Sequence, residues 1–248
     1  MTVLSADAIW AAMSFDRDLV IVAVAWYFVF VMSTVLHEAA HALAAWKLGD
    51  PTAYEGGQVS INPLPHIERE PIGMVVVPLI SLFMYEGRWL MGWASAPYDV
   101  HWALAHPKRA AAMAMAGPAS NFILAALAAC ALKVGLEQGF FVIPKDLRLF
   151  DPTAVVEAAG PGAAIGAAKL LSIMFSLNLI LGVFNLLPLP PLDGSAIVPL
   201  LISREGAAKY RHYAAQPAFW MIGMLIAWNI FPRVFFPIFI TARNAIYG

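Results

Sequence analysis

Residues 35–46 of the chain read VLHEAAHALAAW, and they continue an apolar run that begins at residue 19 and carries no charged residue before Glu38. Ionisable side chains are costly at membrane depth and are usually retained there for function. Histidines four residues apart lie on one face of a helix, one turn from each other. His37 and His41 can therefore reach a common ligand, with Glu38 beside them.

The composition is that of an integral membrane protein. Of 248 residues, 61% are hydrophobic and only 12% are charged, and the mean hydropathy is +0.72. Soluble domains are about half apolar and a quarter charged. The net charge is -1, and the scattered Lys and Arg predict no nucleic-acid partner. The single Cys130 excludes a Cys-rich metal cluster, so His and carboxylate groups would have to hold any metal.

Four apolar runs are long enough to supply the roughly 20 residues that a helix needs to cross a bilayer. They are residues 19–46, 110–132, 170–192 and 213–241. The last run is interrupted by Pro232, Arg233 and Pro237, so its helix is predicted to end near residue 231 and the chain to continue as an interfacial piece. A fifth run, at 71–85, is bracketed by prolines and is short for a span. It is predicted to be re-entrant, or half of a tight hairpin.

The remaining segments complete the predicted fold class. Residues 57–62 alternate apolar and polar side chains before a proline, which indicates a short strand. Residues 133–169 are too few for a separate recognition domain. We therefore predict an all-α membrane protein, a polytopic bundle of transmembrane helices with a re-entrant segment and a short β-strand element. It forms one domain over residues 1–248, with a core of about 19–200 and an accessory C-terminal transmembrane segment at about 213–241.

The residues 37–41 read HEAAH, the HExxH pattern of zinc hydrolases. Two imidazoles bind one zinc ion, and the intervening glutamate is held beside the metal without binding it. Zinc lowers the pKa of water toward about 7, so Glu38 can act as general base. The alternative is a helix that happens to contain two histidines, which an apolar span makes hard to sustain.

A catalytic zinc needs a third protein ligand and an open position. Between Lys169 and Arg204 the only charged residue is Asp193, which follows the prolines of FNLLPLPPLDGS. Alone, an Asp-Gly pair would indicate a turn; beside an HExxH motif, Asp193 becomes the candidate third ligand. For these ligands to meet, the spans 19–46 and 170–192 must run in the same direction. The segment 71–95 must then return to the side that it left.

Small and polar residues gather in the first half of the span 110–132: Gly117, Pro118, Ser120 and Asn121. Two interpretations stay open. Small residues allow close helix approach, and Ser or Asn can hydrogen-bond between helices. Alternatively, Asn121 helps to line the active cavity.

The motifs HEAAH at 37–41 and NLLPLPPLDG at 185–194 together resemble the site-2 protease family of intramembrane zinc metalloproteases, in its compact form without a PDZ domain. GGQVSINPLPHI at 56–67 and AGPASN at 116–121 support the resemblance. It implies one Zn²⁺ per chain, held by His37, His41 and Asp193, with Glu38 as the catalytic base and Asn185 near the substrate carbonyl. The implied partners are a transmembrane protein substrate and the lipid bilayer. The implied location is a bacterial or archaeal cytoplasmic membrane.

Two other functions remain open from the residues alone. A non-catalytic zinc-binding membrane scaffold would not need the base Glu38. A polytopic transporter would spread ionisable groups over several spans and repeated half-helices, whereas here they concentrate in one triad. A membrane HExxH protease of another type is a further alternative, against which the later DG motif argues.

Overall fold

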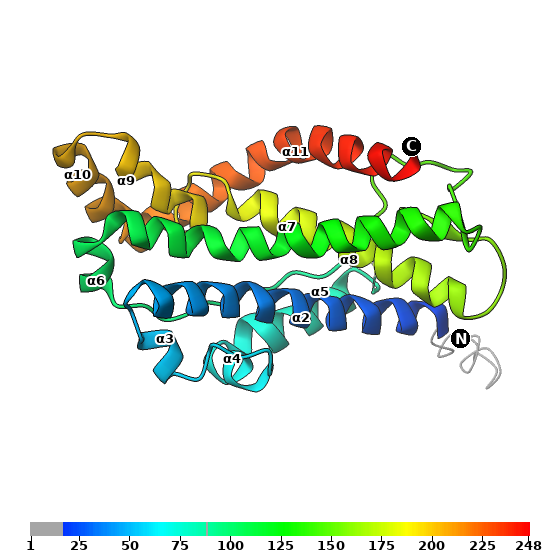
Figure 1. Ribbon diagram of the computed structural model, residues 1–248, viewed down its shortest axis with the longest axis horizontal. Helices are drawn as coiled ribbons and strands as arrows, with labels where there is room; N and C mark the ends of the chain where they lie inside the picture. The colour runs from blue at the N-terminus through cyan, green and yellow to red at the C-terminus, as the bar shows by residue number, and fades with distance from the viewer. Residues whose placement is uncertain (1–16, 88) are drawn as a thin grey trace, which may run out of the picture.

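The computed structural model describes residues 17–87 and 89–248, and long helices dominate it (Figure 1). The four longest are α2 (Arg17–Leu48), α7 (Pro107–Glu137), α8 (Ala163–Asn185) and α11 (Pro217–Tyr247). The shorter helical elements are α3 (Thr52–Glu55), α4 (Leu64–Arg69), the π-helix η1 (Ile72–Val76), α5 (Val77–Met84), α6 (Val100–Ala105), the 3-10 helix η2 (Asp193–Ile197), α9 (Val198–Leu201) and α10 (Arg204–Ala214). Strands β1 (Phe141–Val142) and β2 (Glu157–Ala158) pair antiparallel.

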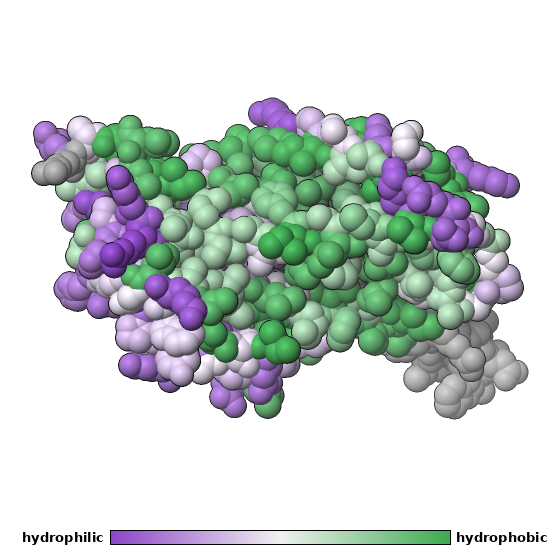
Figure 2. Space-filling model, viewed as in Figure 1, coloured by the Kyte–Doolittle hydropathy of each residue, from purple (hydrophilic) through white to green (hydrophobic). Residues whose placement is uncertain are grey.

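Within the described residues, four helices are long and apolar enough to cross a membrane: Val20–Leu48, Pro107–Glu137, Ala163–Asn185 and Pro217–Tyr247. They confirm the four predicted spans. Apolar side chains cover the middle of the face shown in Figure 2, and hydrophilic side chains gather toward its two ends. The protein is therefore an integral membrane protein. Helices α2 and α8 run in the same direction and α7 runs against them, as the predicted ligands require (Figure 1).

One predicted helix end was wrong, that of the last span. Helix α8 ends at Asn185, because three prolines in the next six residues cannot continue the backbone hydrogen-bond ladder. Helix α11 does not end near 231 but continues through Pro232 and Pro237 to Tyr247. Membrane helices tolerate prolines because the bilayer core holds no water that could hydrogen-bond the backbone groups of an unwound segment. One face of the second half of α11 is also buried, through Phe235 and Phe239, against the other helices.

The apolar segment after α4 is re-entrant, which confirms that prediction. Helices η1 and α5 carry the chain away from α4. The chain then turns at 85–87 and returns in an extended conformation beside these two helices. On the return, the backbone N–H of Met91 donates to Oγ of Ser81 at 2.9 Å, and that of Trp93 donates to the carbonyl of Gly73 at 3.1 Å. The segment therefore ends at the side from which it started.

The predicted strand at 57–62 is absent, and these residues form a folded loop. Oγ of Ser60 accepts from the backbone N–H of Asn62 at 3.0 Å, and Oδ1 of Asn62 accepts from that of Leu64 at 3.1 Å. Such local turns compete with strand pairing. The short β-element that was predicted exists elsewhere, as β1 and β2 in the connection between α7 and α8.

A carboxylate fixes the end of α2 to the chain that enters α6. Asp50 is 1% exposed and accepts from the backbone N–H of Thr52 at 3.0 Å and of Asp99 at 2.8 Å. Burial raises the pKa of Asp50, but the hydrogen bonds from Thr52 and Asp99 outweigh burial and leave the pKa below its ordinary value. A lowered pKa means that the stability from this contact is present near neutral pH and is lost as the pH falls through that pKa.

Two apolar clusters hold the spans in register. One joins α2, through Trp26 and Phe30, to Met74 of the re-entrant segment and Ile173 of α8. The other joins α7, α8 and α11, with Phe239 fully buried in it. Together they fix the relative height of the helices that carry the polar groups described next.

Candidate metal centre

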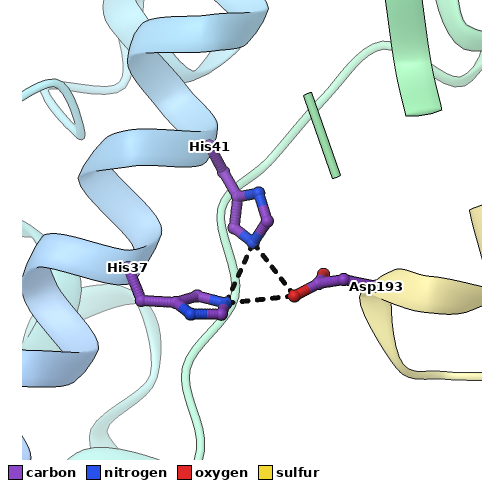
Figure 3. Close-up of side chains that lie close together, drawn as sticks. All are labelled: His37, His41 and Asp193. Atoms are coloured by element: carbon purple, nitrogen blue, oxygen red, sulfur yellow. Dashed lines mark hydrogen bonds and ion pairs between the residues drawn. The ribbon is translucent and has the colours of Figure 1, made fainter. Parts of the chain in front are cut away.

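The three candidate ligands converge on one point (Figure 3). His37 and His41 project from adjacent turns of α2, and Asp193 reaches them from the start of η2. Nε2 of His37 lies 3.0 Å from Nε2 of His41 and 3.1 Å from Oδ2 of Asp193. Nε2 of His41 lies 3.3 Å from the same carboxylate oxygen. Asp193, which follows His41 by 152 residues in sequence, thus completes a triangle of possible ligand atoms with the two histidines.

The other ring nitrogen of each histidine has an oxygen partner. Nδ1 of His41 is 2.8 Å from the backbone carbonyl of Met113, to which it must donate because a carbonyl only accepts. Nδ1 of His37 donates to Oδ1 of Asn121 at 2.5 Å. With the protons on both Nδ1 atoms, the two Nε2 atoms present lone pairs to each other and to a carboxylate. Three acceptors that face one another need a cation between them.

The triangle has the size that zinc requires. Zinc binds His nitrogen and carboxylate oxygen at about 2.0–2.2 Å, and a tetrahedron with such bonds has edges of about 3.3–3.6 Å. The three measured separations, 3.0, 3.1 and 3.3 Å, are close to this range. Two neutral imidazoles and one carboxylate also form a typical catalytic donor set with a fourth position left open. The residues present therefore fit zinc.

A glycine of α7 leaves the space for the ion. A Cβ built on Gly117 would lie 2.5 Å from Nε2 of His37 and closer still to Nε2 of His41. Any side chain here would overlap the Nε2 atoms of both histidines. The small-residue group at 117–121 therefore combines both open interpretations: Gly117 allows close approach, and Asn121 contacts a candidate ligand.

Asp193 lies on a loop that is braced from two sides. Gly194 packs so closely on the carbonyl of Leu186 that a Cβ would overlap it, so the loop folds back on the end of α8 beside the half-buried Asn185. From the other side, Gly223 of α11 packs directly on the carbonyl of Pro190. Leu192 is buried against Ala227 in the same contact.

Glu38 is 5% exposed, on the helix turn that carries both histidines. The structure thus brings together His37, His41 and Asp193, with Glu38 next to His37 on the same helix, while Asn185 is the last residue of α8. The sequence did not identify Asn178, which is fully buried and hydrogen-bonded to Asn121. A lone Asn inside an apolar span would have been the only signal.

Two buried histidines on an HExxH helix and a half-buried aspartate from a later segment, within a membrane-spanning bundle, define the class of membrane zinc metalloproteases. A sequence model of peptidase family M50 matches residues 25–229. The chain is 34% identical over 185 residues to YwhC of Bacillus subtilis, named as a zinc metalloprotease, and the match covers 72% of this chain and 69% of YwhC. The chain belongs to peptidase family M50, the site-2 protease family.

Two further relatives agree. Rip2 of Mycolicibacterium smegmatis, also named as a zinc metalloprotease, is 30% identical over 164 residues, which are 66% of this chain and 52% of Rip2. Rip2 of Mycobacterium tuberculosis is 30% identical over 166 residues, with 67% and 52% covered. The chain thus spans about half the length of the Rip2 proteins. No solved structure matches the chain.

Proposed function

We propose that this protein hydrolyses a peptide bond within or next to a transmembrane segment of a membrane-protein substrate. The observation that carries the proposal is the depth of the triad. His37 and His41 lie within the span Val20–Leu48, and Asp193 reaches them through a loop packed among helices. A hydrolytic centre at this depth meets membrane-embedded peptide more readily than soluble protein.

In this proposal His37, His41 and Asp193 hold one zinc ion. When bound, zinc supplies Lewis-acid chemistry, polarising the scissile carbonyl and lowering the pKa of water toward about 7. Glu38 accepts a proton from the attacking water as the new C–O bond forms, and delivers it to the amide nitrogen as the C–N bond breaks. Asn185 donates a hydrogen bond to the substrate carbonyl, whose oxygen gains negative charge.

The substrate helix must unwind locally before its peptide bond can be attacked. Exposed amides are costly in lipid, so unwinding requires polar partners at the site. Residues 57–62, which were predicted to form a strand, offer the unwound substrate no strand edge, because this segment is a loop whose polar side chains bond its own backbone.

We further propose that the whole chain, residues 1–248, is one domain in the cytoplasmic membrane of a bacterium or archaeon. Residues 1–16 lie outside the described part of the chain. The bacterial sources of YwhC and Rip2 support the location.

The decisive variant is Glu38→Gln, which keeps the size of the side chain and removes its basicity. We expect wild-type zinc content, because Glu38 is not a ligand, and a cleavage rate lower by about 10²–10⁴-fold, the usual contribution of a general base. Zinc per chain would be measured on detergent-purified protein, and cleavage of a transmembrane model substrate in vesicles. The matched control is Glu55→Gln, an exposed position on α3, which should behave as wild type.

The masses of the two products locate the cleaved bond. A bond within or beside the transmembrane segment supports the proposal. Cleavage only in a soluble loop of the substrate contradicts intramembrane proteolysis, and wild-type turnover by Glu38→Gln contradicts the assigned base. A protein that binds zinc without turnover would be a scaffold, and one without zinc reopens the transporter alternative.

A further inference from the structure

A buried chain of hydrogen bonds connects a backbone carbonyl to the candidate ligand His37. Asn121 on α7 and Asn178 on α8 are both 0% exposed. Nδ2 of Asn178 donates to the carbonyl of Met174 at 2.9 Å. Nδ2 of Asn121 donates to Oδ1 of Asn178, also at 2.9 Å. Oδ1 of Asn121 then accepts from Nδ1 of His37 at 2.5 Å.

The direction of this chain is forced from one end. The carbonyl of Met174 can only accept, so the amide nitrogen of Asn178 must face it and its oxygen must face Asn121. Asn121 must therefore turn its nitrogen toward Asn178 and its oxygen toward His37. Reversing both amides would set Oδ1 of Asn178 against the Met174 carbonyl, two acceptors in a buried site.

The same amide group ties the chain to the metal-bearing helix. Nδ2 of Asn178 also donates to Oγ of Ser33 at 2.9 Å, and Ser33 lies one turn before His37 on α2. Both protons on Nδ2 of Asn178 thus have an acceptor, and its oxygen has a donor. A buried amide whose hydrogen bonds are all made, as those of Asn178 are, has a single orientation.

We propose that Asn178 and Asn121 are positioning residues that keep the proton of His37 on Nδ1, so that Nε2 presents a lone pair to zinc. This inference rests on the proposed function, in which His37 is a ligand. His41 needs no such chain because it donates directly to the Met113 carbonyl. For His37, the carbonyl of Met174, four residues before Asn178 on α8, determines which atom donates and which accepts, through the two asparagines.

Zinc affinity, measured by competition with a chelator on detergent-purified full-length protein, is the first readout. Asn121→Leu removes the acceptor, and Asn178→Leu removes the group that orients Asn121. We expect each variant to bind zinc about 10–100-fold more weakly, the usual effect of losing a partner behind a metal ligand. The control is Ser176→Ala on α8, a fully buried hydroxyl without a hydrogen-bond partner among the described residues, which should bind zinc as wild type does.

A rescue separates proton placement from packing. A carboxylate only accepts, so Asp at position 121 receives the His37 proton without any guidance from position 178. We therefore expect the double variant Asn178→Leu/Asn121→Asp to recover most of the zinc affinity that Asn178→Leu loses. A double variant no tighter than Asn178→Leu, or an Asn178→Leu protein that binds zinc as wild type, overturns the inference.

Metal-free wild-type protein provides a test that does not depend on folded variants. With ¹⁵N-labelled histidine, NMR distinguishes Nδ1–H from Nε2–H, and substitution of His37 by Gln assigns its signals. Neutral His37 should carry its proton on Nδ1; a proton on Nε2 overturns the inference. If wild type binds zinc and cleaves while these results fail, only the positioning role is lost. If wild type binds no zinc, the proposed function itself has failed.

Discussion

Gly117→Ala should abolish zinc binding and cleavage although it adds only one methyl group. The new Cβ would lie 2.5 Å from Nε2 of His37, closer still to Nε2 of His41 and 2.6 Å from Cε1 of His41. Overpacking alone costs about 1–3 kcal/mol, and each 1.4 kcal/mol or so is tenfold in affinity. Because the methyl group overlaps the candidate ligand atoms of both histidines, we expect zinc affinity to fall by at least about 100-fold.

The fold should survive this substitution, because the preference of a helix interior for alanine over glycine, roughly 0.5–1 kcal/mol, offsets part of the overpacking cost. Thermal unfolding followed by circular dichroism would verify this, and zinc per chain with substrate cleavage would report the site. The matched control is Gly166→Ala on α8, where a Cβ meets nothing within 4 Å. A Gly117→Ala protein with wild-type zinc content would show that the ion does not lie between these histidines.

Gly223→Val should abolish zinc binding and cleavage, although Gly223 lies on α11, which carries none of the candidate ligands His37, His41 and Asp193. A Cβ at Gly223 would overlap the carbonyl oxygen of Pro190 and lie 3.0 Å from its carbon. Valine must therefore push the loop 186–192 and α11 apart, and displacement of the loop moves Asp193 away from the histidines. Since zinc requires its ligand atoms within about 0.2 Å of ideal distances, we expect zinc and cleavage to be lost together.

The comparison for this prediction is Ala218→Val on the same helix, at an exposed position. It makes a residue of α11 larger without touching the loop, and should keep both zinc and turnover. The smaller change Gly223→Ala should give an intermediate loss. Full zinc occupancy in Gly223→Val would mean that α11 does not brace the loop that carries Asp193.

The sequence was sufficient for what depends on local spacing and composition. Four helices of membrane length follow from apolar runs, and the shared face of His37 and His41 follows from the helical repeat. Asp193 could be selected because it is the only charged residue between Lys169 and Arg204. The structure brings its carboxylate within 3.3 Å of both histidines.

What depends on tertiary placement could not be predicted. Asn178 is an unremarkable polar residue in its span until α7 brings Asn121 within 2.9 Å of it. The role of Gly117 depends on how closely α7 approaches α2. The alternation of apolar and polar residues at 57–62 indicated a strand. Alternation alone does not show that the side chains of Ser60 and Asn62 accept hydrogen bonds from the backbone two residues ahead. The helix α11 was expected to end at its prolines because prolines usually end helices in soluble proteins. In a membrane the helix continues through them.

The position of the histidines along α2 determines how a cleaved helix would be divided. His41 lies seven residues before Leu48, the end of α2, which is about 10 Å at 1.5 Å per residue, in a hydrocarbon layer about 30 Å thick. Under the proposed function, a transmembrane substrate cut at this level would yield two unequal stubs. The stub on the side of α3 and α6 keeps only about 10 Å of apolar helix, far short of the roughly 20 residues that anchor a segment. That fragment would leave the bilayer, and its partner would stay behind, so one cut turns a membrane protein into a diffusible one.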